Sequence, residues 1–156
     1  MRQQRPTIRF RPRSRQHRSR RQLPYRGRVS LLSQGELAFF RALSVAIGSR
    51  YGISLKTRLA DVLCCPPELW ETPHGWRISQ KHLDFVLYDR VSARIVAAIE
   101  LDDRTHNQRD RRVRDAFLEQ AFNTAGILLV RFIASSAYDT FEIGRRIETA
   151  IGRRFD

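Results

Sequence analysis

The chain has 156 residues, 42% of them apolar, and a net charge of +13. That length suits one domain with a buried core, and no apolar run approaches the roughly 20 residues that a membrane-spanning helix requires. The N-terminus lacks the apolar core of a secretory signal, so we expect a cytoplasmic protein with no membrane partner. The adjacent thiols Cys64 and Cys65 form neither a disulfide framework nor a zinc site, and we expect both to be partly buried in a loop.

The positive charge is concentrated at the N-terminus. Residues 1–35 contain no Asp or Glu, whereas eleven arginines lie between Arg2 and Arg28. Subtracting those eleven charges from the net +13 leaves +2 for the rest of the chain. A segment of this composition does not repay its ordering entropy, so we predict a disordered basic tail over residues 1–29 and a folded domain over residues 30–156. The tail serves either as a salt-sensitive contact to nucleic-acid phosphates or as a solubilising or targeting leader.

The folded domain is predicted to open with a helix that begins at Ser33. Ser33 and Glu36 have the spacing of a capping box, and either Gly48 or Gly52 ends the helix. The apolar positions that follow Glu36 at helical intervals are Phe40, Leu43 and Ile47. Glu36 therefore shares a face with the apolar stripe, where it acts either as a cap or as a carboxylate of a functional site.

A strand and a long loop are predicted next. Residues 53–59 alternate between apolar and polar positions, which places Lys56 on the polar face of the strand. Residues 60–78 are rich in proline and glycine and predict a loop that carries Trp70 and Trp76. These tryptophans either stack on nucleic-acid bases or, as is commoner, cap the core.

The most informative stretch, residues 82–103, predicts a β-hairpin with carboxylates at one end. Residues 82–88 and 94–101 have strand patterns, and the residues between them have turn composition. If the turn is centred near Ser92, Asp84 lies opposite Glu100, and His82 lies opposite Asp102. Directly opposed like charges are destabilising, so a positive group, most naturally a divalent metal ion, should lie between them.

The remaining sequence predicts a helix over residues 107–125, a strand over residues 127–133 and a last helix that begins with Ser136 and Asp139. The residues expected to pack from the last helix are Phe141, Ile147 and Ile151. Arg131 interrupts an apolar strand and needs a carboxylate or phosphate partner. The order of helix, three strands, helix, strand and helix indicates an α/β domain with a mixed sheet: an antiparallel hairpin, then a crossover helix to the last strand.

The candidate site is an acidic cluster. Its members are Asp84, Glu100 and Asp102, with Glu36, His82 and His106 as accessory groups. Hard oxygen ligands of this kind suit Mg²⁺ or Mn²⁺, which polarise a phosphodiester and stabilise its leaving oxygen. A base or charge stabiliser is also needed, and the role is open to His106, His82 and Lys81. An equally weighted alternative is a surface hairpin whose acids pair with arginines, Arg104 and Arg131 included.

Several stretches carry a resemblance to a known family. They are L-L-S-x-x-E-x-x-F-F over residues 31–40, K-H-L-D-F-V over 81–86, A-I-E-L-D-D-x-x-H over 98–106 and R-D-A-F over 114–117. Together they resemble the bacterial domain-of-unknown-function family 2726, over roughly residues 31–151. That family is similar to the PD-(D/E)XK nuclease superfamily and to the very-short-patch mismatch-repair endonucleases. The resemblance implies a restriction-endonuclease-like αβββαβ core, a central mixed sheet flanked by helices.

Carried over position by position, the resemblance implies that Asp84 and Glu100 hold Mg²⁺ or Mn²⁺ and that Glu36 supports the site. Asp102 stands where the superfamily pattern has lysine. Either Asp102 is a third metal ligand, with His106 as first choice and Lys81 as second choice for the role of the lysine, or the site binds nucleic acid with little or no catalysis. The residues expected to contact nucleic acid, DNA above all, are Arg104, Arg109, Arg112, Arg131 and Trp76.

The function expected from the sequence is therefore a metal-dependent DNA endonuclease or nickase. The alternative is a nuclease-like module that binds nucleic acid without cutting it. A third and less specific hypothesis is a small regulatory or interaction domain. A homo-oligomer is compatible with each of them.

Overall fold

The computed structural model describes residues 23–102 and 108–153, with side chains described outside residues 108–115. Its helices and strands are α1 (Gln34–Ile47), β1 (Tyr51–Arg58), α2 (Pro73–Ser79), β2 (His82–Asp89), β3 (Ile95–Asp102), α3 (Gln108–Ala125), β4 (Leu128–Ile133) and α4 (Thr140–Gly152). Two short 3₁₀ turns, η1 (Leu59–Asp61) and η2 (Pro67–Leu69), lie between β1 and α2. The disordered tail predicted for residues 1–29 lies mostly outside the described residues.

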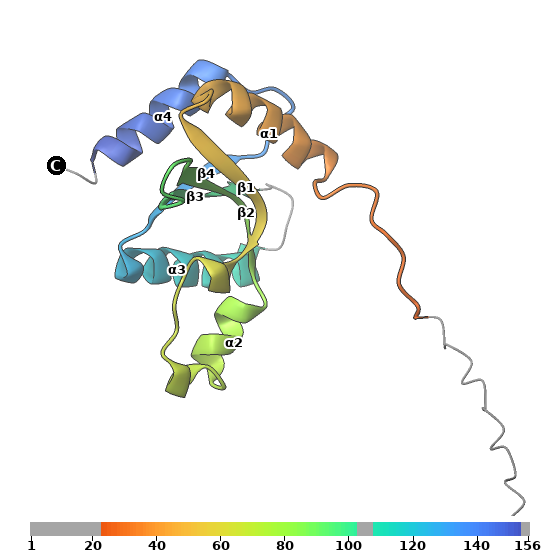
Figure 1. The fold of residues 1–156 in the computed structure, drawn as a ribbon, viewed down its shortest axis with the longest axis vertical. Coiled ribbons are helices and arrows are strands. Elements are labelled where there is room, and N and C mark those ends of the chain that lie inside the picture. Colours follow the sequence, from red (N-terminus) through yellow and green to blue (C-terminus); the bar gives the residue numbers. More distant parts are fainter. Residues whose placement is uncertain (1–22, 103–107, 154–156) are drawn as a thin grey trace, which may run out of the picture.

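The four strands form one mixed sheet in the order β1-β2-β3-β4 (Figure 1). The pairs β1–β2 and β2–β3 are antiparallel, whereas β4 runs parallel to β3 after the crossover through α3. The predicted order of helices and strands is confirmed except for α2, which lies where a loop was predicted. The antiparallel hairpin and the crossover helix to the last strand are confirmed. The class of the fold is α/β with a mixed sheet flanked by helices.

The hairpin has the register that the sequence predicted. Phe85 pairs with Ile99 and Leu87 with Ala97, and the register shifts only next to the turn, where Tyr88 pairs with Ile95. The Asp89 side chain closes the turn by accepting hydrogen bonds from two backbone N–H groups. Continuing the register one residue beyond the Phe85–Ile99 pair brings Asp84 opposite Glu100 at the far end of the hairpin. That end of the sheet is where the candidate site lies.

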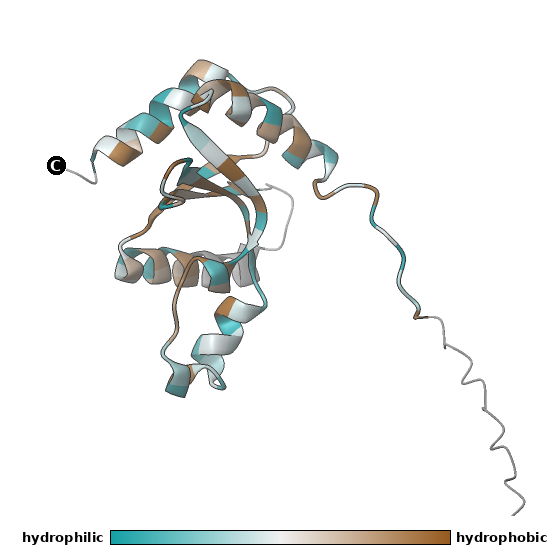
Figure 2. Cartoon of the chain, in the orientation of Figure 1, coloured by the Kyte–Doolittle hydropathy of each residue, from teal (hydrophilic) through white to brown (hydrophobic). Residues whose placement is uncertain are grey.

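Two apolar layers hold the sheet between its helices. Helices α1 and α4 cover one face and α3 covers the other (Figure 1), and hydrophobic residues gather on the central strands (Figure 2). Phe39 of α1 is fully buried, and its ring lies 5.0–5.5 Å from the rings of Phe85, Phe132 and Tyr138. Aromatic burial of this kind is worth several kcal/mol in total, on the order of 2–3 kcal/mol per fully buried ring. The core therefore fixes the position of α1, and with it Glu36, relative to the hairpin.

The segment between β1 and β2, residues 59–81, is not the long loop that was predicted. Thr72 caps α2 and Pro73 occupies its first turn, which is the position in a helix that proline tolerates best. Gly75 packs so closely on the backbone of Trp70 that a Cβ at this position would lie 2.0 Å from the Trp70 carbonyl oxygen. We name this compact unit the excursion; proline and glycine serve there as helix start and close-packing residue rather than as loop formers.

The tryptophans of the excursion do not cap the core. Trp70 is 44% exposed and Trp76 is 56% exposed, so the commoner role that the sequence suggested for them is wrong. The thiols there also differ from the expectation in part, because Cys64 is exposed and only Cys65 is half-buried.

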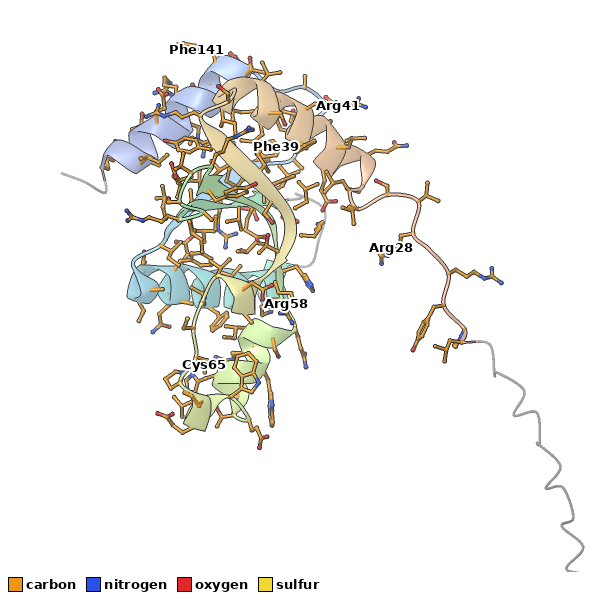
Figure 3. All side chains as sticks on the ribbon, viewed as in Figure 1. Arg28, Phe39, Arg41, Arg58, Cys65 and Phe141 are labelled. Atoms are coloured by element: carbon orange, nitrogen blue, oxygen red, sulfur yellow. The ribbon has the colours of Figure 1, made fainter. Side chains whose placement is uncertain are left out.

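The last helix differs from its prediction at its start and in its packing face. It is capped by Asp139, whose side chain accepts from the Phe141 and Glu142 N–H groups, and not by Ser136. Phe141 is 77% exposed and points away from the core (Figure 3), whereas Ile143 and Ile147 are buried. Ile143 and Ile147 are four residues apart and share the buried face of α4. Phe141 lies two residues before Ile143, on another face of the helix, which explains its exposure. Among the described helices, none combines the length and the apolar character needed to cross a bilayer.

Candidate functional site

A lysine joins three elements at the carboxylate-rich end of the sheet. The Lys56 Nζ atom, on β1, donates a hydrogen bond to Glu36 Oε1 on α1 and another, of 2.8 Å, to Asp84 Oδ1 on β2. The side chains of Glu36, Lys56 and Asp84 are 21%, 31% and 16% exposed, so water reaches the group but does not surround it. We call these three residues the lysine cluster.

The backbone at Lys56 is unusual for its residue type. Its φ of 49° lies in the left-handed region, which costs a side-chain-bearing residue on the order of 1–2 kcal/mol. The neighbouring pairs Leu55–Phe85 and Thr57–Leu83 keep one register with β2, and no pair is formed at Lys56 between them. Strained positions persist where the surrounding structure holds them, and they concentrate at functional sites.

The ionisation of the cluster favours a fully charged state. Burial alone would raise the pKa of Glu36, but hydrogen bonds from Lys56 and Ser33 outweigh it and leave that pKa below its ordinary value. Burial would likewise lower the pKa of Lys56, but its hydrogen bonds to Asp84 and Glu36 outweigh it and raise that pKa. At neutral pH, Lys56 is therefore an ammonium and Glu36 is a carboxylate.

The capping box predicted for α1 is present and gives Glu36 a second role. Glu36 Oε2 accepts from the Ser33 N–H at 2.8 Å, and the Ser33 hydroxyl accepts from the Glu36 N–H at 3.3 Å. One carboxylate oxygen thus caps the helix while the other contacts Lys56. The cap role that the sequence allowed for Glu36 is confirmed, and its role in a functional site stays a prediction.

Asp84 is also fixed from the other side. Its Oδ2 atom accepts from the Leu101 N–H on β3 at 3.0 Å, so one carboxylate links β1, β2 and β3. Next to Leu101 is Glu100, which is 3% exposed and is the buried charged residue of the described core. Continuing the pairing of Phe85 with Ile99 by one residue brings the backbone of Glu100 opposite that of Asp84. Both acidic residues therefore lie at the same end of the sheet as Lys56.

Asp102 belongs to a second ion-pair group on the neighbouring strand. Arg131 Nη1 on β4 lies 3.0 Å from Asp102 Oδ1, and Arg131 Nε lies 3.1 Å from Glu119 Oε1 on α3. The expectation that Arg131 requires a carboxylate partner is confirmed. Arg131 is also the ladder neighbour of Glu100, so the two ion-pair groups lie on neighbouring strands of one sheet.

Lys81 and His82 lie next to the lysine cluster rather than within it. Both line a polar cavity of about 240 Å³ with Leu59, Leu83 and Leu118. His82 is exposed at the start of β2, and the Lys81 carbonyl oxygen accepts from the Leu59 N–H at 2.8 Å. The structure therefore gives the acidic site a lysine, but from β1 rather than from position 81.

Several predicted site residues lie outside the part of the chain whose side chains are described. Arg104 and His106 fall in the gap between β3 and α3, and for Arg109 and Arg112 only the α3 backbone is described. Within the described residues, no group of three or more His, Cys, Asp or Glu side chains is placed to hold a metal ion. Trp76 is described and stands exposed on α2.

Lys56 is the site residue that the sequence reasoning missed. Alternation along β1 assigned it to a polar face, and alternation carries no information about a left-handed backbone. One signal was available, because Lys56 and Lys81 are the only lysines in a chain with 29 lysines and arginines together. A lysine kept in so arginine-rich a chain indicates a position where a compact ammonium is needed rather than a guanidinium.

The structure is an α/β domain with a mixed four-stranded sheet, and one end of that sheet carries an acidic hairpin and a lysine. The particular family follows from comparison: residues 28–151 match the family described as protein of unknown function DUF2726, and the chain belongs to that family. A search of curated proteins and a search of solved structures each found no match to the chain.

The charge of Lys56 should matter for stability over a defined pH range. Lys56→Met leaves two partly buried carboxylates without their shared cation, so we expect the free energy of unfolding at pH 7 to fall by about 1–3 kcal/mol. The lowered pKa of Glu36 means that its contribution is present above its ordinary value of 4.5 and is lost as the pH falls through the lowered one. The raised pKa of Lys56 means that its contribution is complete below 10.5 and is lost only as the pH rises through the raised value.

Urea unfolding of wild type and Lys56→Met from pH 3 to pH 9 measures this difference. We expect it to be largest near neutral pH and smaller at pH 3. Arg50→Met is the matched control, because Arg50 and Glu148 form an exposed ion pair, and exposed pairs contribute less than about 1 kcal/mol. A pH-independent loss in Lys56→Met would contradict the ionic origin of the effect.

The backbone strain at Lys56 predicts an order among its variants. Lys56→Gly and Lys56→Ala both remove the ammonium, but only glycine adopts a φ of 49° without a steric penalty. We therefore expect Lys56→Gly to be more stable than Lys56→Ala by about 1 kcal/mol, the reverse of their order in an ordinary strand. Chemical denaturation at pH 7 decides it, and a more stable alanine variant would show that the left-handed backbone is not formed in solution.

Proposed function

We propose that this chain is a metal-dependent nuclease that hydrolyses phosphodiester bonds of DNA, with the lysine cluster and Glu100 as its active site. One observation carries the proposal: Lys56 reaches Asp84 from a neighbouring strand and supplies the positive charge that the sequence pattern lacks at position 102. The resemblance of the D…E-x-D pattern to the PD-(D/E)XK nucleases and to the very-short-patch endonucleases supports the same conclusion, as does the basic N-terminus.

The residues present suit Mg²⁺ or Mn²⁺. The convergent donors are carboxylate oxygens, Asp84 and Glu100, and Mg²⁺ in nucleases and related enzymes is commonly held by one or two carboxylates and the substrate phosphate. When bound, the ion supplies Lewis-acid polarisation of the phosphodiester and charge stabilisation.

Lys56 has the ionisation state of an electrostatic stabiliser and not of a general base. A basic lysine needs a lowered pKa, whereas the pKa of Lys56 is raised. A protonated Nζ atom beside Asp84 can exchange a carboxylate oxygen for a phosphate oxygen and hold the negative charge that develops on it. Glu36 accepts a second hydrogen bond from the ammonium, which holds the ammonium in place and favours its protonated form.

Asp102 has a different role in this proposal from the third-ligand role that the sequence pattern suggested. Its two oxygens lie 3.0 and 3.3 Å from Arg131 Nη1, so it orients an arginine at the site border. Arg131 would then face the backbone of the nucleic acid. Base-independent phosphate contacts of this kind position a substrate without reading its sequence.

A second candidate, a nuclease-like module that binds nucleic acid without cutting it, is favoured by one observation. The ammonium of Lys56 already pairs with both Glu36 and Asp84, so part of the negative charge of the site is compensated by the chain's own residue. Such a module predicts salt-dependent DNA binding that survives EDTA and the loss of Glu100.

Cleavage of supercoiled plasmid by the full-length protein tests the two candidates. With Mg²⁺ or Mn²⁺ we expect nicking that EDTA abolishes and that Asp84→Asn lowers at least 100-fold, because the isosteric amide keeps the Leu101 hydrogen bond but loses the ligand charge. Lys56→Met should show a loss of similar size, and Lys56→Arg a smaller one. Glu148→Gln, an exposed acid on α4, should cut like wild type.

The outcomes separate the candidates. Cutting by Asp84→Asn at the wild-type rate would contradict the site, and it would trace the activity to other residues or to a contaminant. Plasmid binding without cutting in both metals would reject the nuclease and select the binding module.

The role of Asp102 can be measured in the same assay. If Asp102 orients Arg131, Asp102→Asn keeps a hydrogen-bond acceptor for the guanidinium and should lower the cleavage rate by less than about tenfold. If it is a metal ligand, the loss should match that of Asp84→Asn and be partly restored by raising the Mn²⁺ concentration. Thermal unfolding of each variant controls for loss of folded protein.

A further inference from the structure

The excursion carries an exposed aromatic ring on the outer face of a helix. In α2, Gly75 and Ile78 are buried while Trp76 between them is 56% exposed. The ring lines an open hollow of about 320 Å³ with Pro73, Arg77, Gln80 and Lys81. A single exposed ring is ordinary on a protein surface, so the chemistry of the groups around it decides whether it is a contact site.

The chemistry around the two exposed tryptophans differs. Residues 72–82 contain Arg77, Lys81 and two histidines but no acidic side chain, whereas Trp70 lies between Glu68 and Glu71. An anionic partner is therefore favoured at Trp76 and disfavoured at Trp70. Aromatic rings set among cations and amide donors match the needs of a nucleic-acid strand, whose bases stack while its phosphates pair with the cations.

The surface of Trp76 lies close to the lysine cluster. The Leu59 N–H donates to the Lys81 carbonyl oxygen at 2.8 Å and closes the base of the excursion. Lys56 precedes Leu59 by three residues and Asp84 follows Lys81 by three, which at a strand rise of about 3.3 Å per residue is roughly 10 Å on each side. Arg58, at the end of β1, marks this junction in Figure 3. A strand of nucleic acid seated on Trp76 thus needs only a few nucleotides to reach Asp84.

From these observations we infer that α2 is a base-stacking platform and that the substrate is DNA with unpaired bases, with Trp76 stacking on a base and Lys81 and Arg77 contacting phosphates. The inference rests on the proposed function for its account of cleavage but not for its account of binding. Bases inside a duplex are covered on both faces by their neighbours, so an exposed ring selects single strands or locally unpaired sites. The platform then presents the adjoining phosphodiester to the lysine cluster.

Binding in EDTA tests this inference without cleavage. A labelled single-stranded 20-mer and its fully paired duplex are titrated with the full-length protein, and fluorescence anisotropy gives the two dissociation constants. Loss of one stacked base predicts that Trp76→Ala weakens single-strand binding about 5- to 100-fold. Duplex binding should change less than twofold, and Trp76→Phe should keep most of the single-strand affinity.

Trp70→Ala is the matched control, since it removes another exposed tryptophan ring from the same excursion but from the acidic side. It should leave both dissociation constants within twofold of wild type. Single-strand affinity that survives Trp76→Ala, as binding by the basic tail alone would give, overturns the inference, and so do equal losses on single strand and duplex. Plasmid cutting that persists while Trp76 proves irrelevant would leave the nuclease standing and remove the platform.

Discussion

The ammonium of Lys56 is the interaction on which this end of the molecule depends. It lies between two carboxylates that come from different elements, Glu36 of α1 and Asp84 of β2. Without a cation between them, like charges held this close in a partly buried place would repel. A left-handed backbone brings the ammonium to that position, so the local strain and the two ion pairs are parts of one arrangement. The charges thereby fasten a helix to the sheet where the aromatic core ends.

The apolar core determines where the helices and strands lie, and the charged edge of the sheet carries the ion pairs. Phe39 and its aromatic neighbours determine where α1 lies on the sheet, and the capping box of that helix then fixes the direction of Glu36. The hairpin register determines which carboxylates face each other. A second ion-pair group around Arg131 continues the charged edge across β4. Each charged side chain is thus placed by an element whose own position is set by apolar packing, which is how rigid sites are built.

Sequence reasoning predicted the parts of this design that follow from periodicity. Alternation and turn composition were enough for the hairpin register, and an arginine inside an apolar strand was enough to require the acid that Asp102 supplies. Three features escaped it. The left-handed Lys56 is a backbone property that alternation does not encode; Trp76 and Phe141 are large apolar residues that a pattern assigns to the core but that the helix phase turns outward. Proline and glycine in the excursion predicted a loop because their roles as helix start and close-packing residue depend on neighbours in space.

The hydrogen bond between the Leu59 N–H and the Lys81 carbonyl oxygen has a consequence for how such a protein diversifies. It joins the two ends of the excursion and helps to keep the spacing of the charges on β1 and β2. Val62, Leu63 and Ile78 pack into the core beside β2, so they are constrained, whereas the exposed residues between them can vary as surface insertions do between fixed anchor points. Under the proposed nuclease function, relatives that share the charged edge but differ in the exposed part of this segment would keep one chemistry and act on nucleic acids of different shapes.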